Sequence, residues 1–316
     1  MFYSLLTWDF SKDYYQKVAK YMIEGYKSGI TPNPDIMCNK EIKFGLFLKK
    51  AIKEGADYIA TGHYARKHEL RITNNESRFK LLKAKDLNKD QSYFLYTLTQ
   101  HQLKHCLFPI GDYRKSKVRQ LARKFGLPNY DKKDSQGICF VGQLNLKDFL
   151  KNFIKSKKGE IRLLPDNKII GYHDGAWYYT IGQRHGLNLS LGGGPYYVAD
   201  KNIKKNILYV AKESKELFKQ STILQDVSWI NPIRLPFIGK IKIRYRANSQ
   251  PALITKNGSA KSLILKFIKS QKAITPGQSA VIYKNDVVLG GGIMRQDFNL
   301  TKKRLTGHFG RYFQAH

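Results

Sequence analysis

The first thirty residues alternate apolar and polar positions with the period of an amphipathic helix. Large apolar side chains recur at every fourth position, at Phe10, Tyr14, Val18, Met22 and Tyr26. Side chains at this spacing lie on one face of a helix, and Gly29 is a typical helix stop. The pattern therefore predicts a helix that begins after Asp9 and buries one face.

The following segments switch between helical and strand-like patterns. We expect a helix from about Lys40 to Glu54, then a short apolar strand in "DYIATGHYAR" that runs into a turn at Gly62 and His63. Residues 71–86 predict a hairpin, and residues 89–106 a helix capped by Asp90 or Ser92. Alternating helix and strand indicates an α/β sheet, in which functional groups gather where strands end, although a lone histidine there is often structural.

After about Asn145 the pattern changes to short alternating runs separated by Gly, Asp and Asn. From about Leu217 the alternation is typical of a small β-barrel. We therefore predict three units: an α/β domain over residues 1–145, a small central β-rich domain over 146–212 and a terminal β-barrel over 213–316.

The charge of the chain indicates a polyanionic partner. Its 316 residues contain 56 Lys and Arg against 24 Asp and Glu, a formal net charge of +32 spread along the whole chain. Such a field attracts nucleic acid, although a biased base composition of the gene would also raise the lysine content. Three cysteines cannot form a disulfide framework, and we find no signal peptide or membrane-spanning apolar run. We expect a cytoplasmic protein with no membrane partner.

The stretch "TPNPDIMCNKEIKF" places a cysteine beside two prolines. Pro32 and Pro34 restrict the backbone on both sides, so a stiff loop is expected from Thr31 to Asp35. Cys38 would lie where this loop meets the next helix, where free amide groups favour a thiolate. The pattern equally fits a small apolar residue in a core, and both interpretations stay open.

The other two cysteines differ in their surroundings. Cys106 ends a predicted helix, and we interpret it as a core residue. Cys139 lies in a short apolar segment between Gly137 and Gly142. Such a segment is either a buried strand or a tight loop that another backbone approaches closely.

Nine motifs occur in the order found in the bacterial tRNA-specific 2-thiouridylase family, which the chain resembles from about Asp9 to Gly292. They are "TPNPDIMCNKEIKF", "ATGHYAR", "KDQSYFLY", "FPIGDYRK", "DSQGICFVG", "YTIGQRHGL", "GGGPYYV", "RYRA" and "TPGQSAVIY". The resemblance implies ATP-dependent transfer of sulfur from a cysteine persulfide to C2 of the wobble uridine in lysine, glutamate and glutamine tRNAs. It also implies a persulfide relay protein or a cysteine desulfurase as sulfur donor.

The same resemblance implies roles for individual residues. Cys139 would carry the persulfide, Cys38 would be the second thiol nucleophile that closes a disulfide with it, and Asp35 would be a general acid or base. Asn33, Pro34 and Asp35 would contact the target base, and Gly62 would lie near the nucleotide. Residues that match positions expected to touch the anticodon stem-loop are His63, Lys89, Asp90, Gln91, Ser92, Arg244, Tyr245 and Gln278. For Tyr245 the alternative is barrel packing, and for Gln278 it is shaping a turn.

One family motif has no counterpart in these 316 residues. Family members begin with a strand and a Ser-Gly-Gly-x-Asp-Ser phosphate loop, and no such segment occurs here. We therefore expect an incomplete PP-loop domain of the adenine-nucleotide alpha-hydrolase type, with ATP and Mg²⁺ binding dependent on a missing segment. The sequence predicts no set of protein metal ligands. Alternatives are a non-catalytic tRNA-binding remnant of the family and, with less support, a redox protein unrelated to RNA.

Overall fold

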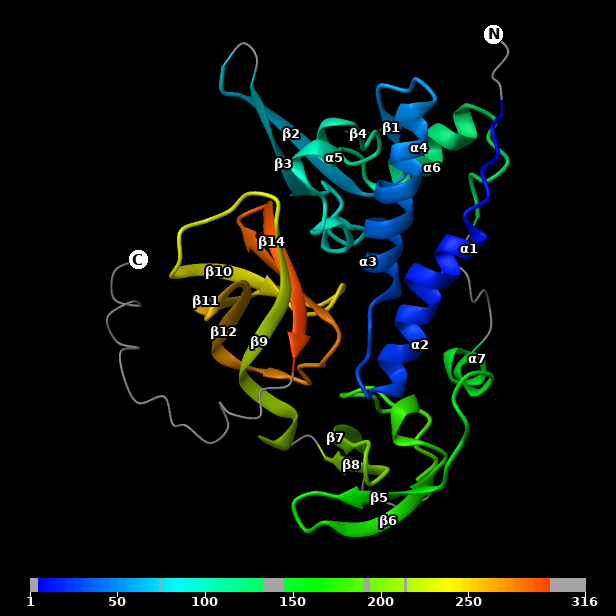
Figure 1. Ribbon diagram of the computed structural model, residues 1–316, viewed down its shortest axis with the longest axis vertical. Coiled ribbons are helices and arrows are strands. Elements are labelled where there is room, and N and C mark those ends of the chain that lie inside the picture. The colour runs from blue at the N-terminus through cyan, green and yellow to red at the C-terminus, as the bar shows by residue number, and fades with distance from the viewer. Residues whose placement is uncertain (1–4, 74–75, 133–144, 190–193, 213–214, 296–316) are drawn as a thin grey trace.

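The first helical segment is continuous and buries one face, as its sequence pattern predicts. The computed structural model describes residues 5–73, 76–132, 145–189, 194–212 and 215–295 (Figure 1). Within them, α1 (Ser11–Tyr14), a π-helical segment (Tyr15–Ala19) and α2 (Lys20–Lys27) follow one another without a break. The residues buried along this segment include Val18, Met22 and Tyr26, which confirms the predicted apolar face.

The second helical segment begins earlier than the sequence pattern predicts. It consists of α3 (Pro34–Cys38), a π-helical segment (Asn39–Phe47) and α4 (Leu48–Lys53). The expected start at Lys40 is wrong because Asn33 caps the helix and proline fits the first helical position. Cys38 is therefore the fifth residue of the helix and not a junction residue.

A small parallel pair of strands follows the second helical segment. Strand β1 (Ile59–Ala60) pairs with β4 (Cys106–Leu107), and α5 (Gln100–Lys104) precedes β4. The predicted helix cap at Asp90 or Ser92 is wrong. Thr99 forms a capping box with Gln102 and starts α5, whereas Asp90 precedes only a 3-10 turn (Ser92–Leu95). Helix α6 (Lys115–Lys124) lies on the surface.

The predicted hairpin is present and joins the barrel. Strands β2 (Ala65–Arg71) and β3 (Ser77–Lys83) pair with each other, and β3 pairs with β14 (Val287–Arg295). The other barrel strands are β9 (Phe218–Trp229), β10 (Phe237–Lys242), β11 (Gln250–Asn257), β12 (Ser259–Lys272) and β13 (Ser279–Lys284). The sheet order is β13-β10-β11-β12-β9-β14-β3-β2, and pairing of β13 with β14 closes the barrel.

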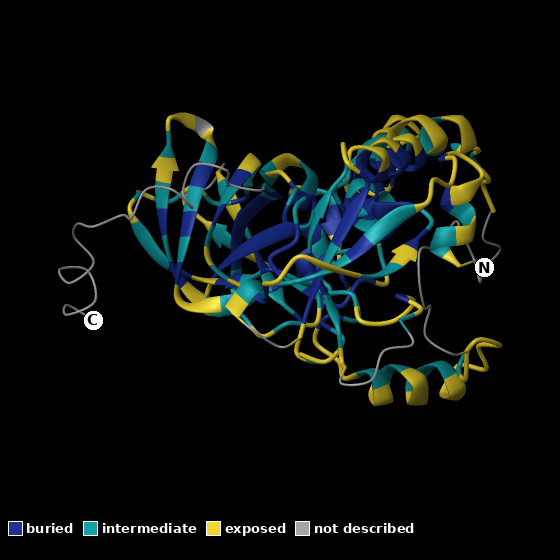
Figure 2. Cartoon of the chain, turned by 90° about the horizontal axis from the view of Figure 1, so that it is seen from below, coloured by how far each residue is buried: buried dark blue, intermediate teal, exposed yellow. Residues whose placement is uncertain are grey.

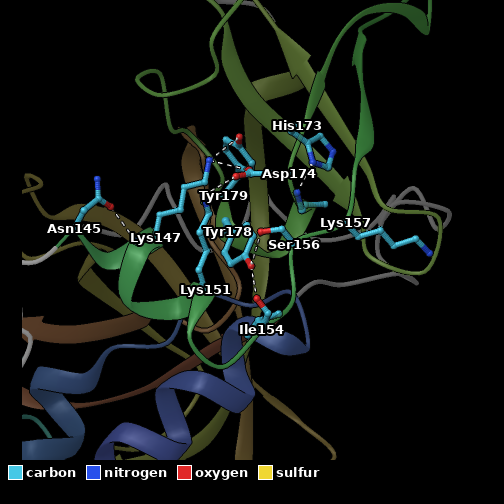
Figure 3. Close-up of polar contacts among 12 residues, drawn as sticks. Asn145, Lys147, Lys151, Ile154, Ser156, Lys157, His173, Asp174, Tyr178 and Tyr179 are labelled. Atoms are coloured by element: carbon cyan, nitrogen blue, oxygen red, sulfur yellow. Dashed lines mark hydrogen bonds and ion pairs between the residues drawn. The ribbon is translucent and has the colours of Figure 1, made fainter.

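The central unit is a four-stranded sheet with one short helix on it. Strands β5 (Gly159–Leu163), β6 (Lys168–His173), β7 (Tyr197–Asn202) and β8 (Ile207–Ala211) are ordered β6-β5-β8-β7. Helix α7 (Leu146–Lys151) is fixed to this unit by Asp174, whose two oxygens lie 2.8 Å from Lys147 Nζ and 3.1 Å from Lys151 Nζ (Figure 3).

The units share hydrophobic cores, and Figure 2 shows the buried segments in the interior of the molecule. Leu81 and Tyr93 of the first unit pack in one cluster with Val281 and Tyr283 of the barrel. Met22 of α2 packs in another with residues of the central sheet. Contacts between units therefore fix the segment that joins the two long helical segments.

Among the described residues, no helix is both long and apolar enough to cross a membrane.

Candidate active site

The turn that precedes α3 is held by both of the other units. Thr31 donates its backbone N–H to Pro276 O at 2.9 Å and its hydroxyl to Thr180 Oγ1 at 3.1 Å. Gln278 Nε2 donates to the carbonyl oxygens of Thr31 at 2.9 Å and of Pro32 at 3.2 Å. The turn is thus positioned by side chains that lie more than 140 residues away in sequence.

Gly277 allows the barrel to approach this closely. Its φ is +91°, in the region that favours glycine, and a Cβ there would lie 2.9 Å from backbone atoms of Thr31. The alternative interpretation of Gln278, that it shapes a turn, therefore receives support from its contacts. Its proposed contact with tRNA stays a prediction.

Asp35 lies in the first turn of α3 with its carboxyl partly buried. Burial raises the pKa of Asp35, and the Lys43 ammonium opposes that rise. The described residues give this carboxylate no hydrogen bond. A proton therefore stays on Asp35 at higher pH than on an exposed aspartate, as general acid or base chemistry requires.

His63 is brought close to the same lysine. It is only 8% exposed, its Nδ1 lies 3.0 Å from Thr61 Oγ1, and its ring packs against Phe44. Burial first, and then the Lys43 charge, lower the pKa of His63 to about 4, so the imidazole is neutral at physiological pH. The Lys43 ammonium lowers the pKa of both groups, so Asp35 and His63 lie within electrostatic reach of one lysine.

Sequence reasoning missed Lys43 as a site residue. It lies eight residues after Asp35, about two helical turns along the same segment, and it is exposed. Gly62 directly precedes His63, two residues after the end of β1, and a Cβ added there would meet no atom within 4 Å. An open surface therefore adjoins His63.

Cys38 lies in an apolar cluster between the two long helical segments. It is 5% exposed and packs with Val18 and Ile42, and the side chains around them are Phe10, Tyr14, Met37 and Leu46. These surroundings match the packing interpretation of Cys38, and its reactivity stays a prediction. Cys106 is fully buried, and burial raises the pKa of its thiol to about 12. Both observations agree with the interpretation of Cys106 as a core residue. Cys139 lies outside the described residues, so its predicted proximity to Cys38 stays a prediction.

The segment from Lys89 to Ser92 is fixed mainly by its own side chains. Asp90 is 2% exposed and accepts hydrogen bonds from the backbone amides of Ala84 and Ser92. Gln91 Oε1 accepts from the Tyr64 amide at 2.9 Å, which ties the segment to the residue after His63. Contact of these residues with tRNA stays a prediction, and their present contacts give the segment its shape.

Arg244 and Tyr245 lie where the barrel meets the other units. Arg244 Nη2 donates to Ala273 O at 2.7 Å and, more weakly, to Ile181 O at 3.4 Å in the central unit. The Tyr245 ring lies 4.5 Å from that of Phe94, so it is packed against the first unit and the barrel-packing interpretation of Tyr245 gains support. Their predicted contact with RNA stays untested.

Family models match each unit of the chain in order. A model described as "tRNA methyl transferase HUP domain" matches residues 3–143. One described as "tRNA methyl transferase PRC-barrel domain" matches residues 147–212. One described as "Aminomethyltransferase beta-barrel domain" matches residues 219–294. The matches agree with the predicted architecture of a PP-loop-type α/β domain, a small central β domain and a terminal barrel.

Curated relatives match nearly the whole chain. A tRNA-specific 2-thiouridylase MnmA from Nitrosococcus oceani is 46% identical over 90% of this chain and 78% of its own length. One from Staphylococcus saprophyticus is 46% identical over 90% of this chain and 76% of its own length. A third, from Geobacillus kaustophilus, is 47% identical over 90% and 77%, respectively. The resemblance found in the nine motifs is thus confirmed, and the chain belongs to the tRNA-specific 2-thiouridylase family.

Proposed function

We propose that this chain acts in the cytoplasm in the 2-thiolation of the wobble uridine of lysine, glutamate and glutamine tRNAs. The observation that carries the proposal is the turn before α3, which the barrel clamps while Asp35 keeps a raised pKa. A clamped turn is a rigid surface against which a displaced base can be held. The high positive charge supplies the attraction for the tRNA backbone.

The target base would lie against Asn33, Pro34 and Asp35. A base within an anticodon loop must be splayed from its stack before an enzyme can reach C2. Asn33 Oδ1 already accepts the Ile36 amide as a helix cap, which leaves the Asn33 amide nitrogen as the donor toward a uracil carbonyl. Pro34 presents an apolar ring, and Asp35 would hold or release the proton that the departing C2 oxygen requires.

Sulfur transfer would use two thiols in sequence. The terminal sulfur of a Cys139 persulfide attacks C2 and expels the activated oxygen, so that a Cys139–S–S–C2 linkage forms. The Cys38 thiolate then attacks Cys139 Sγ, the S–S bond breaks, and its electron pair leaves with the sulfur on C2. A Cys38–Cys139 disulfide remains, which a two-electron thiol reductant returns to the dithiol. A persulfide relay protein or a cysteine desulfurase would reload Cys139.

ATP would supply the leaving group by activating the C2 oxygen. The open space at Gly62, beside the neutral His63, fits an edge of the nucleotide. We assign no contact with the ATP phosphates or with Mg²⁺ to this chain. Its 316 residues contain no Ser-Gly-Gly-x-Asp-Ser segment, and the described residues contain no group of three His, Cys, Asp or Glu side chains that could hold a metal ion.

The test is formation of 2-thiouridine, measured by mass spectrometry of digested tRNA with ATP, Mg²⁺ and a persulfide donor. The chain is assayed alone and fused at its amino end to a Ser-Gly-Gly-x-Asp-Ser segment from a relative. We expect the fusion to be active and the chain alone to be inactive. Cys38→Ser and Cys139→Ser should abolish activity in the fusion, whereas Cys106→Ala, a matched change of a core cysteine, should retain it.

A non-catalytic tRNA-binding role is the second candidate, and the burial of Cys38 in an apolar cluster favours it. The same assay separates the two candidates. A fusion that binds tRNA but forms no 2-thiouridine would favour the binding role. Activity that survives Cys139→Ser would contradict the proposed sulfur route.

A further inference from the structure

A hollow lies next to the clamped turn, on the side that faces the barrel and the central unit. It is a cleft of about 920 Å³ at the junction of all three units. Residues 28–31 at the end of α2 form one wall, residues 200–204 at the end of β7 form the second, and barrel residues near the ends of β9 and β14 form the third. Figure 1 shows these elements meeting below the barrel. Thr31 lines the cleft and also begins the turn that leads to Asp35.

The cleft is strongly basic. Four cationic residues line it, Lys201 and Lys204 from the central unit and Lys219 and Arg295 from the barrel. Asp200 is the one acidic residue among the lining residues, and its Oδ1 already accepts the Lys201 backbone N–H at 2.8 Å. The walls therefore carry an excess of positive charge that the lining residues do not neutralise.

Two of these cations are held in unusual surroundings. Arg295 Nε is buried and finds no hydrogen-bond acceptor among the described residues. Lys201 Nζ donates to Tyr179 O at 2.5 Å, and burial lowers the pKa of Lys201 to about 8. A buried donor without an acceptor and an ammonium in low-dielectric surroundings are both stabilised by an anion in the cleft.

A smaller hollow of about 380 Å³ gives the contrast. It is also lined by lysines, but Lys242 Nζ lies 3.7 Å from Asp90 and Lys83 Nζ lies 3.8 Å from Asp286. Its positive charges are thus partly matched by protein carboxylates. In the larger cleft the lining residues Lys204 and Lys219 form no ion pair in the described part of the chain.

We propose that the three-unit cleft is a phosphate-binding site that holds the backbone of the substrate RNA beside the clamped turn. This inference rests on the proposed tRNA substrate. It adds a second surface for that substrate, whose four basic residues all lie outside the nine sequence motifs. The cleft is large enough for more than one phosphate. Because every unit contributes a wall, RNA in it would hold the three units together around the target base.

The test uses Lys204→Ala with Lys219→Ala in the whole chain, compared with Lys168→Ala and Lys256→Ala, two exposed lysines outside both hollows. Affinity for tRNA is measured by filter binding from about 50 to 200 mM salt. Log affinity falls with log salt, and each lost phosphate contact should make this negative slope shallower by about 1. We expect the double variant in the cleft to make the slope shallower by about 2, and the double variant at the two control lysines to leave the slope unchanged.

Free polyphosphate is the other source of the same chemistry, so calorimetry with inorganic tripolyphosphate is run on the same variants. Loss of tRNA affinity assigns the cleft to the RNA backbone. Loss of tripolyphosphate binding alone assigns it to a free anion. If the cleft pair changes neither, or if the wild-type chain binds neither ligand, the inference is overturned. If the fusion with the Ser-Gly-Gly-x-Asp-Ser segment binds tRNA through the cleft but forms no 2-thiouridine, the proposed function is refuted and the cleft site stands.

Discussion

Two aspartates that each precede or begin a helical turn have opposite surroundings. Asp90 is buried with its oxygens occupied by the amides of Ala84 and Ser92, by the Ser92 hydroxyl at 3.1 Å and by the Lys242 ammonium. Asp35 is partly buried, accepts no hydrogen bond from the described residues and has a raised pKa. In the sequence both are polar residues within a motif, yet the fold satisfies Asp90 with hydrogen bonds and gives the Asp35 carboxylate none among the described residues.

The difference indicates how a carboxylate that stabilises the fold can be distinguished from one that is suited to proton transfer. A buried carboxylate that accepts several hydrogen bonds is stabilised in its charged form and fixes the backbone around it. A desolvated carboxylate without such partners keeps its proton more readily and can exchange it with a substrate. The comparison therefore makes separate predictions for activity and for stability.

The largest expected effect is on catalysis at Asp35. Asp35→Asn keeps the size of the side chain but removes its acid, so thiolation in the phosphate-loop fusion should fall by about 10²- to 10⁴-fold. Affinity for tRNA and the melting temperature should stay close to wild type. Rate assays with saturating tRNA would measure the loss. A variant that thiolates at the wild-type rate would remove the chemical role of Asp35 and end the contrast with Asp90.

Asp90 should show the reverse pattern. Asp90→Ala leaves the partly buried Lys242 ammonium, the Ser92 hydroxyl and two buried backbone amides without their partner, so the free energy of unfolding should fall by about 3–5 kcal/mol. Denaturant titration followed by circular dichroism would measure the loss. Asp112→Ala is the control, because its side chain is largely exposed and its contact with Arg66 is 3.9 Å long. That change should cost no more than about 0.5 kcal/mol.

The pH dependence of stability sharpens the comparison through His63. Because the pKa of His63 is about 4, the unfolded chain binds a proton more readily than the folded protein between about pH 6.5 and 4. The free energy of unfolding should therefore fall as the pH falls through that window, by about 3 kcal/mol in total. His63→Gln should lack this component. The raised pKa of Asp35 changes the free energy of unfolding with pH in the opposite direction, but it does so in both the wild type and the His63→Gln variant. The difference between their two pH curves therefore isolates the contribution of His63.

The smallest effect is expected at the clamp on the Asp35 turn. Gln278→Ala removes two side-chain hydrogen bonds, which stabilise the turn by about 1 kcal/mol each, so thiolation should fall by at most about 30-fold. The decrease should appear in kcat, because the turn loses its position while other tRNA contacts remain. A decrease confined to tRNA affinity, with kcat unchanged, would show that Gln278 contacts RNA and that the turn does not depend on it.

Local patterns were enough to predict most elements. The apolar spacing from Phe10 to Tyr26 predicted the first helical segment, and alternation after Leu217 predicted the barrel. The start of α3 was missed because Pro34 was interpreted only as a loop residue, although proline also fits a first helical position behind an Asn cap. The cap at Thr99 was missed because Asp90 offered the same chemistry earlier in the chain.

The site was harder to predict because its contacts cross the whole chain. Asp35 and His63 were identified through motifs, but the clamp from Gln278 and the hydroxyl contact from Thr180 to Thr31 join residues separated by 247 and 149 positions. Hydrogen bonds to carbonyl oxygens at such separations leave no periodic signal in the sequence. Lys43 was overlooked because one exposed lysine among many carries no distinguishing mark until its neighbours are placed.

The pairing of β3 with β14 makes the first unit and the barrel a single folding entity. Val287 and Val288 continue the barrel sheet into the hairpin, and Tyr283 shares a core with Tyr93. An isolated barrel cut out at its sequence boundary would expose that strand edge and half of the shared core, which favours aggregation. The two segments must therefore be present together for the barrel to be complete, although slightly more than 200 residues separate β3 from β14 and the central unit is inserted between them.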